Sequence, residues 1–491
     1  MSKTITTLFA AAAISAAGYA THIHGPESTS GASPAAPLAT IPVQAAEGPA
    51  QVLITNVNVW DGTSDSLLMG YDVLVDGGKI SKIGKGLEAS GANVVDGQGG
   101  TLTPGLIDMH QHLMLNGGTT AGENWDAYVQ GAHASRAAEY LLRSGFTTIR
   151  DIAGNSIGLK RAINSGVLPG PRMYTSGPAL GPTGGHSDWG SHNAAPGDPS
   201  YQSKVQNTFV IDGVDAWLRA ARWNFRNGAD FIKVMSGGGV ASVFDPIDLN
   251  SPSPAEMEAA VQVASEYGGY VAIHGYTDAA YNKSLDAGVK SYEHGFLISE
   301  ETVKRMAAEN VWWSWQPYGS FNTFGMGNFP DWFTDDMREK GAAVAVGCVQ
   351  VPKWMKKHGV RIFNGSDMFG WDNWHNALVN VTYPIEITDS PFTSLDAMKM
   401  STSSAGEALL ELSAPSRNPF RKAKLGVIEE GAWADMLIWN GDPTQNIKLI
   451  LEEANLRLIM KDGKLYKNLL VAPTHDSYRG SMAPSGHSWS M

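Results

Sequence analysis

Apolar and polar positions alternate along residues 50–103 in the manner of short β-strands with one buried face. Turn signals such as Asp61-Gly62 and Asp96-Gly97 separate the runs. Similar runs return near the C-terminus at 434–439 and 456–460. Since each end holds only a few strands, we expect one small β-sandwich domain formed from both chain ends, residues 50–103 and 425–470.

The intervening residues 104–424 repeat a different pattern, in which an apolar run ends in polar residues and a helix-period segment leads to the next run. Helices are expected at 134–144, 254–267 and 279–287. Repeated β–α units require a parallel sheet, and the length of this region suits an α/β fold of the (β/α)8 TIM-type barrel class. An open doubly wound sheet is the alternative, but no Gly-rich dinucleotide loop follows the first strand of the region.

The two ends of the chain have the composition of processing and linking segments. Residues 1–20 combine Lys3, a short apolar stretch and small residues before Ala20, as in a signal peptide. Residues 21–49 are rich in Ala, Pro, Ser and Gly and predict a linker, and 471–491 predicts a polar tail. A periplasmic or secreted protein is expected.

Composition narrows the classes of partner. The formal net charge is −12 and no dense Lys/Arg run occurs, which disfavours nucleic acid and anionic membranes as partners. The N-terminal apolar stretch is too short to span a bilayer, where about 20 residues are needed. Cys348 is the single cysteine, so no disulfide can form within the chain.

Several apolar runs end in side chains that bind metals. His110 and His112 are two residues apart and face the same side of a strand, which makes half of a zinc site. His274 and His294 each close an apolar run, and Asp367 ends the run 360–367 in the same way. Structural histidines and a helix cap at Asp367 are the alternatives. Because the carboxyl ends of barrel strands meet at one face, we expect these side chains to converge.

Lys233 is unusual because it lies inside an apolar stretch that predicts a buried strand. Burial of an unpaired ammonium costs several kcal/mol and lowers the pKa of the amine. One interpretation is a side chain that extends from the strand to solvent or pairs with an acid. The other is a neutral amine that CO2 converts into a carbamate, whose two oxygens bridge two metals.

These residues occur in a familiar order. The order HxH, strand Lys, His, His and Asp resembles that of the amidohydrolase superfamily. The stretches that carry the resemblance are 102–112, 145–151, the Gly-Gly-His at 184–186, 274–276, 287–289 and 293–295. The local sequences are similar to its imidazolonepropionase-like and Xaa-Pro dipeptidase branch, which includes ochratoxinase-type enzymes. The resemblance extends from about residue 50 to about residue 470.

The resemblance implies a site with two divalent metal ions, zinc being the expected metal. His110, His112 and Asp367 would hold the more buried ion, His274 and His294 would hold the second, and N6-carboxylated Lys233 would bridge them. His186 and Tyr276 would face the substrate and polarise the scissile carbonyl.

A catalytic mechanism follows from these roles. A hydroxide held between two metals attacks the amide carbonyl, and Asp367 acts as general base and then as general acid. The expected function is hydrolysis of a carbon–nitrogen bond in a small amide or peptide, and family likeness suggests a homo-oligomer. The alternatives are a hydrolase or deaminase of cyclic amides or heterocycles, an enzyme for lactones or esters, and a non-catalytic metal-binding protein.

Two aromatic clusters flank the expected site and bear on the substrate. One is Trp312, Trp313 and Trp315, and the other is Phe369, Trp371 and Trp374. They pack in the core, or they line a wide apolar pocket. Under the second interpretation the substrate is an N-acyl amino acid, a hydrophobic or Xaa-Pro dipeptide, or an ochratoxin-like aryl amide.

Overall fold

A computed structural model of the chain describes residues 51–115, 126–368 and 373–470. The predicted signal peptide (1–20), the linker (21–49) and the C-terminal tail (471–491) lie outside the described residues and stay predictions, as do the domain boundaries. Within the described ranges, none of the helices combines the length and the apolar character needed to cross a lipid bilayer.

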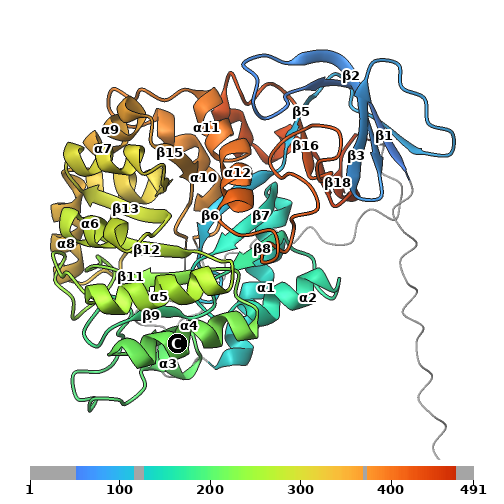
Figure 1. The fold of residues 1–491 in the computed structure, drawn as a ribbon. Helices are drawn as coiled ribbons and strands as arrows, with labels where there is room; N and C mark the ends of the chain where they lie inside the picture. The colour runs from blue at the N-terminus through green and yellow to red at the C-terminus, as the bar shows by residue number, and fades with distance from the viewer. Residues whose placement is uncertain (1–50, 116–125, 369–372, 471–491) are drawn as a thin grey trace, which may run out of the picture. The chain divides into compact units, whose positions relative to one another are not determined.

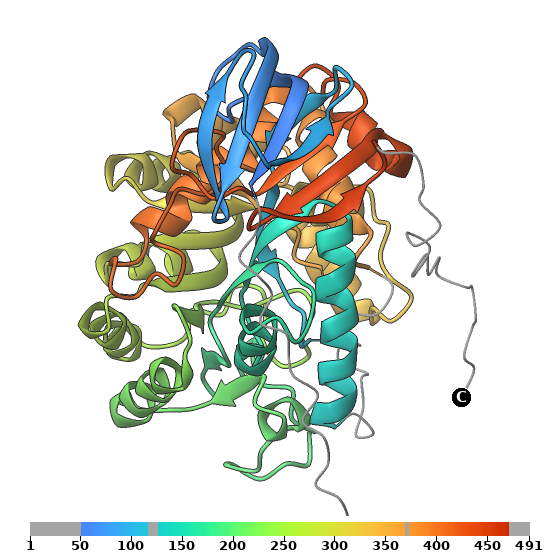
Figure 2. The same ribbon diagram turned by 90° about the vertical axis from the view of Figure 1, so that its right-hand side faces the viewer.

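Strands from both ends of the chain share one sheet (Figures 1 and 2). In the described residues this sheet has eight strands in the order β18-β17-β16-β5-β1-β2-β3, with β4 paired to β1. Strand β5 joins the two ends because it pairs with β1 on one side and with β16 on the other. The hydrogen-bond ladders thus form one continuous sheet, and its packing as a β-sandwich stays a prediction. Its strands are β1 (Val52–Val59), β2 (Leu68–Asp76), β3 (Lys79–Gly84), β4 (Asn93–Asp96), β5 (Thr101–Pro104), β16 (Met436–Trp439), β17 (Leu456–Lys461) and β18 (Lys464–Asn468).

The middle of the chain forms parallel sheets. Among the described residues, one sheet has seven strands in the order β10-β9-β11-β12-β13-β14-β15 and another has three, β6-β7-β8. Their pairings are parallel, as the alternation of strands and helices predicts. The strands are β6 (Leu106–Gln111), β7 (Phe146–Asp151), β8 (Arg172–Thr175), β9 (Ala179–Gly181), β10 (Thr208–Val210), β11 (Ile232–Met235), β12 (Val271–Thr277), β13 (Ser291–Leu297), β14 (Trp312–Trp315) and β15 (Arg361–Asn364).

Backbone hydrogen bonds connect the two parallel sheets at both junctions. The N–H of Asp230, just before β11, donates to the carbonyl of Thr175 in β8 at 2.7 Å. The N–H of Asp367, just after β15, donates to the carbonyl of His110 in β6 at 2.7 Å. The predicted parallel α/β architecture is confirmed, but the ladders of the described residues do not run continuously around a closed barrel because β6–β8 form a separate sheet.

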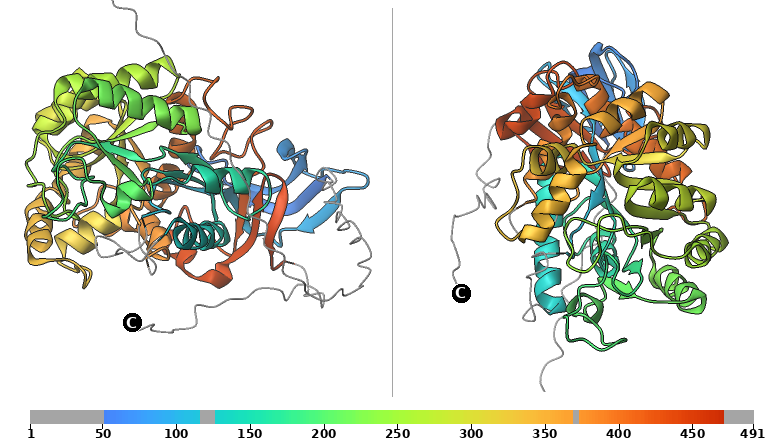
Figure 3. Two further views of the ribbon diagram at one scale, coloured as in Figure 1. Left: turned by 90° about the horizontal axis from the view of Figure 1, so that it is seen from below. Right: turned by 90° about the vertical axis from the view of Figure 1, so that its left-hand side faces the viewer.

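Helices follow the parallel strands, and Figures 1 and 3 show α4–α7 along one side of β9 and β11–β13. The helices predicted at 134–144, 254–267 and 279–287 correspond to α1 (Ala127–Arg143), α5 (Pro254–Glu266) and α6 (Asp278–Asp286). A capping box of Ser253 and Glu256 fixes the start of α5. The remaining helices of the described residues are α2 (Ile157–Asn164), α3 (Tyr201–Lys204), α4 (Val214–Asn227), α7 (Glu300–Ala308), η2 (Tyr318–Gly325), α8 (Asp335–Ala345), α9 (Gln350–His358), α10 (Asn376–Thr382), η3 (Tyr383–Ile385), α11 (Ser394–Met400), α12 (Ser403–Glu411), η4 (Ile447–Leu451) and η5 (Glu453–Asn455).

Candidate active site

The residues predicted to bind metal lie in or just after the parallel strands, and all of them line one cavity of about 340 Å³. The residues predicted to face the substrate line the same cavity. Both sets come from segments that are distant in sequence, and the parallel arrangement of the strands brings them together. They are His110, His112, His186, Lys233, His274, Tyr276, His294 and Asp367.

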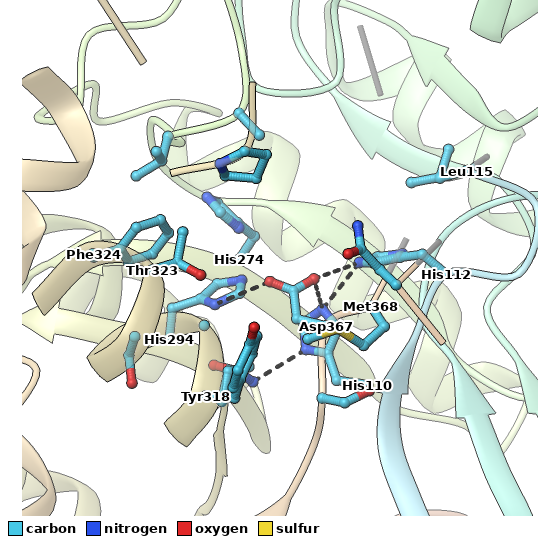
Figure 4. Close-up of a pocket in the computed structure, with 18 of the residues that line it drawn as sticks. His110, His112, Leu115, His274, His294, Tyr318, Thr323, Phe324, Asp367 and Met368 are labelled. Carbon is cyan, nitrogen blue, oxygen red and sulfur yellow. Dashed lines mark hydrogen bonds and ion pairs between the residues drawn. The ribbon is translucent and has the colours of Figure 1, made fainter. Parts of the chain in front are cut away.

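His110, His112 and Asp367 form a compact cluster (Figure 4). Their ligand atoms lie within 4.8 Å of one another, and Asp367 Oδ1 is 3.0 Å from His112 Nε2 and 3.3 Å from His110 Nε2. Burial acts to raise the pKa of Asp367, but the two histidines outweigh it and hold that pKa below its usual range. Asp367 is therefore ionised at neutral pH. It also has a φ of +58°, a backbone conformation that is uncommon outside glycine and concentrates at functional sites.

His274 and His294 lie on the other side of Asp367. Their ring centroids are 4.5 Å apart, and His294 Nδ1 is 3.9 Å from Asp367 Oδ2. Lys233 belongs to β11, is 1% exposed, and its Nζ has no hydrogen-bond partner among the described residues. Burial lowers the pKa of Lys233 to about 8. Because the amine is buried, a group that binds Nζ or modifies it is needed to offset the cost.

The donor set fits a divalent metal site. Imidazole nitrogens and a carboxylate are ligands that zinc prefers, and the cluster has the small spacing that a shared ion requires. The buried Nζ of Lys233 adds a polar atom that the protein alone leaves without a partner in the described residues. The arrangement is therefore chemically consistent with the two-metal site that the sequence predicts, although the roles of the individual residues stay predictions.

Sequence reasoning missed an ion pair that supports His110. Glu293 in β13 accepts a hydrogen bond from His110 Nδ1 at 2.8 Å and one from Arg150 Nη2 at 2.6 Å. Arg150 in β7 is fully buried and also donates to the carbonyl of Met109. Burial acts to raise the pKa of Glu293, but Arg150 and His110 hold it well below its usual range. A charged residue inside an apolar strand, the signal that identified Lys233, could also have identified Glu293.

His186 and Tyr276 flank the histidines of β12 and β13. The ring of His186 stacks on His274 with centroids 4.1 Å apart, and His186 Nδ1 is 2.9 Å from Ser242 Oγ. A buried carboxylate oxygen of Asp245 lies 3.4 Å from the same nitrogen, so His186 Nε2 is left for other partners. Asp245 was also missed, because its sequence context is a loop without a recognisable motif. Tyr276 is 3% exposed, and its ring centroid is 5.3 Å from that of His294.

Where the structure describes the two aromatic clusters, it supports the core interpretation. Trp312, Trp313 and Trp315 are at most 3% exposed and pack in the hydrophobic core, so the pocket interpretation is wrong for them. Phe369 and Trp371 lie outside the described residues. Trp374 is partly buried and packs against the core. The apolar lining of the cavity comes instead from Leu115, Trp189, Met235, Val240, Phe296, Tyr318, Phe324, Pro330, Trp332, Phe333 and Met368.

Comparisons with known proteins find relatives that match most of the chain. The sequence profile of the amidohydrolase family matches residues 101–466. Ochratoxinase of Aspergillus niger is 28% identical over 394 residues, which are 77% of this chain and 78% of that protein. Its crystal structure has a TM-score of 0.72 at 25% identity and covers 86% of this chain and 96% of that chain.

Two further crystal structures are similar over most of the chain. An amidohydrolase has a TM-score of 0.77 at 30% identity and covers 85% of this chain and 99% of that chain. A prolidase complexed with N-methylphosphonate-L-proline has a TM-score of 0.77 at 27% identity and covers 85% and 100%. The predicted resemblance is confirmed, and the fold is that of these relatives, an α/β TIM-type barrel with an additional domain.

Proposed function

The chain belongs to the amidohydrolase family, and from this premise we propose that it is a metal-dependent hydrolase that cleaves an amide bond. The observation that carries the proposal is the cavity in which two buried histidines and the partly exposed Asp367, two further histidines and a buried lysine lie together. Structural histidines have no reason to converge on one cavity from separate strands, whereas metal ligands must do so.

The positions of these side chains in the cavity suggest which of them bind each metal ion. His110, His112 and Asp367 would hold one divalent ion, and His274 and His294 would hold a second, with carboxylated Lys233 between them. Zinc suits this set of nitrogen and carboxylate donors. When bound, two such ions lower the pKa of a water molecule and polarise a carbonyl group.

The side chains supply the proton transfers and the binding of the carbonyl. Asp367 is ionised, so it can accept the proton of the attacking water and then deliver it to the departing nitrogen. His186 and Tyr276 border the same space. Tyr276 can donate a hydrogen bond to the carbonyl oxygen as negative charge develops there, and His186 can donate through Nε2 when both of its ring nitrogens carry a proton. Asp245 and Ser242 hold the ring of His186 through its Nδ1.

We further propose that the substrate is an N-acyl amino acid, a hydrophobic or Xaa-Pro dipeptide, or an ochratoxin-like aryl amide. The similarity to A. niger ochratoxinase and to a prolidase supports an amide or a peptide. The apolar lining of the cavity supports a bulky group on one side of the scissile bond. Zinc-loaded protein should release a carboxylate and an amine from such compounds, whereas release of ammonia would favour a deaminase.

Replacement of Lys233 with Ala tests the metal site. We expect the variant to lose bound metal and turnover together, and a short carboxylic acid to restore part of both by standing in for the carbamate. Lys461→Ala is the matched control, because Lys461 is another largely buried lysine, 9% exposed, that does not line the cavity. The metal content of both variants is measured by elemental analysis. Two metals per chain and wild-type turnover in Lys233→Ala would refute the proposed ligand set.

Export is a separate proposal. Residues 1–20 have the features of a signal peptide. Expression of the full chain followed by fractionation and N-terminal sequencing of the product should find a shortened protein outside the cytoplasm. A full-length cytoplasmic product would refute it.

A further inference from the structure

One continuous segment, residues 316–333 between β14 and α8, builds a large part of the cavity wall. Figure 4 shows Thr323 and Phe324 of this segment on the same side of the cavity as His274 and His294. The wall therefore stands directly beside the proposed metal site. Its residues that line the cavity are Gln316, Tyr318, Gly319, Ser320, Thr323, Phe324, Asn328, Pro330, Trp332 and Phe333.

The backbone of the wall segment is held in place. Residues Tyr318–Gly325 form a π-helix, a rare conformation that is frequent at functional sites. The N–H of Tyr318 donates to Asn380 Oδ1 at 2.9 Å, and Tyr383 Oη donates to Asn322 Oδ1 at 3.2 Å. Both partners belong to the elements α10 and η3. The wall is thus a preformed surface.

The wall segment carries almost no charge. Asp331 is the sole ionisable acid or base besides tyrosine in residues 316–333, and it is exposed and does not line the cavity. The polar groups that do line it are neutral, such as Ser320, Thr323 and Asn328. An ionised substituent would lose its hydration against this surface and gain no countercharge from it, whereas an apolar group gains from leaving water.

We propose that residues 316–333 form a subsite for an uncharged aromatic or branched acyl group, and that Phe324 sets the selectivity for the size of that group. The assignment rests on the proposed function. The amino acids that would leave carry a carboxylate, and the uncharged wall offers no cation to bind it, so the acyl group is the part that faces the wall.

The test uses zinc-loaded full-length protein and four N-acyl glycines. The N-benzoyl and N-acetyl compounds compare bulk, and the N-butanoyl and N-succinyl compounds compare charge at similar size. We expect kcat/KM to be about 10- to 200-fold higher for benzoyl than for acetyl, the range that apolar pockets give. We also expect butanoyl to exceed succinyl by at least about tenfold, because only the succinyl group carries a charge to desolvate.

Substitutions of Phe324 then test whether this side chain causes the selectivity for acyl groups. Phe324→Ala should lower the ratio of benzoyl to acetyl by about tenfold while the metal content stays at the wild-type value. Phe324→Leu, which keeps more of the packing, should lower it by less. Met326→Ala is the matched control, because Met326 belongs to the same segment, is 61% exposed and does not line the cavity.

The outcomes separate the two proposals. If the protein hydrolyses neither these compounds nor the dipeptides, the proposed function and the subsite are both overturned. Hydrolysis with equal rates for the paired compounds would overturn the subsite alone. Folded, metal-loaded Phe324 variants that keep the wild-type ratio would overturn the role of Phe324.

Discussion

Replacing Glu293 with Gln should weaken metal binding without removing a metal ligand. The ionised Glu293 can only accept hydrogen bonds, so His110 Nδ1 must donate to it, and His110 Nε2 is left with a free lone pair. That nitrogen is the one that lies 3.3 Å from Asp367 Oδ1 in the proposed ligand cluster. The buried guanidinium of Arg150 keeps Glu293 ionised.

A Gln at position 293 cannot make suitable hydrogen bonds to both His110 and Arg150. If its amide oxygen faces Arg150, its NH2 group faces His110 Nδ1 and requires that nitrogen to accept. The proton of the imidazole then moves to Nε2, which cannot bind a metal while it is protonated. If the amide is turned the other way, its NH2 group faces the guanidinium, and two donors meet in a buried space.

The size of the effect follows from this geometry. Loss of an outer partner of a ligating histidine typically costs about 10- to 100-fold in metal affinity, which is about 1.4–2.8 kcal/mol. The apoprotein should lose roughly 1.5–3 kcal/mol of unfolding free energy, the value of a hydrogen bond to a charged group. The loss stays below the roughly 3–5 kcal/mol for a buried charge left without a partner, because Arg150 also donates to Met109 O and Ser291 Oγ.

Zinc affinity is measured by competition with a chromogenic chelator, and stability by urea unfolding of the apoprotein. Glu309→Gln is the control, because it makes the same change in a half-exposed pair with Arg305. That control should keep its metal affinity and lose less than about 1 kcal/mol. Wild-type zinc affinity in a folded Glu293→Gln variant would refute the claim that Glu293 fixes the tautomer of His110.

Two further predictions concern the fold. Arg172 in β8 donates to the buried Asp435 at 2.7 Å, so Arg172→Ala should lower the free energy of unfolding by roughly 3–5 kcal/mol, measured with urea. The control Arg143→Ala breaks an exposed ion pair and should lower it by less than about 1 kcal/mol. Equal losses in the two variants would refute the argument from burial. Cys348 is fully buried and burial raises the pKa of its thiol, so a chromogenic disulfide reagent should label it only after unfolding, and rapid labelling of the native protein would contradict the structure.

That these side chains meet in one cavity could be predicted because each carries a local signal. His274, His294 and Asp367 close apolar runs, and a parallel α/β fold brings such strand ends to one face. Lys233 was conspicuous because a charged residue interrupts a buried strand. The architecture was predictable for a similar reason, since alternating apolar runs and helical segments leave a parallel sheet as the simplest arrangement.

The partners of these residues could not be predicted, because their roles depend on contacts across the fold. Glu293 and Arg150 come from different strands, and only the folded chain brings their side chains to 2.6 Å. The same limit explains why the sequence left two alternatives open for Trp312, Trp313 and Trp315. Strand alternation predicts that neighbouring side chains face opposite sides, but it does not reveal whether a side faces the core or a cavity.

Charge links two of the proposals, the carboxylation of Lys233 and the binding of metal ions beside it. As an ammonium, Lys233 would repel cations from the space that His110, Asp367 and His294 border. Burial lowers its pKa to about 8, which makes the neutral amine accessible. Addition of CO2 to that neutral amine with loss of a proton would give a carbamate, which places a negative charge where the ammonium places a positive one and supplies two ligand oxygens. If both proposals hold, the modified lysine and the metals would stabilise each other, since each would offset the cost of burying the charge of the other.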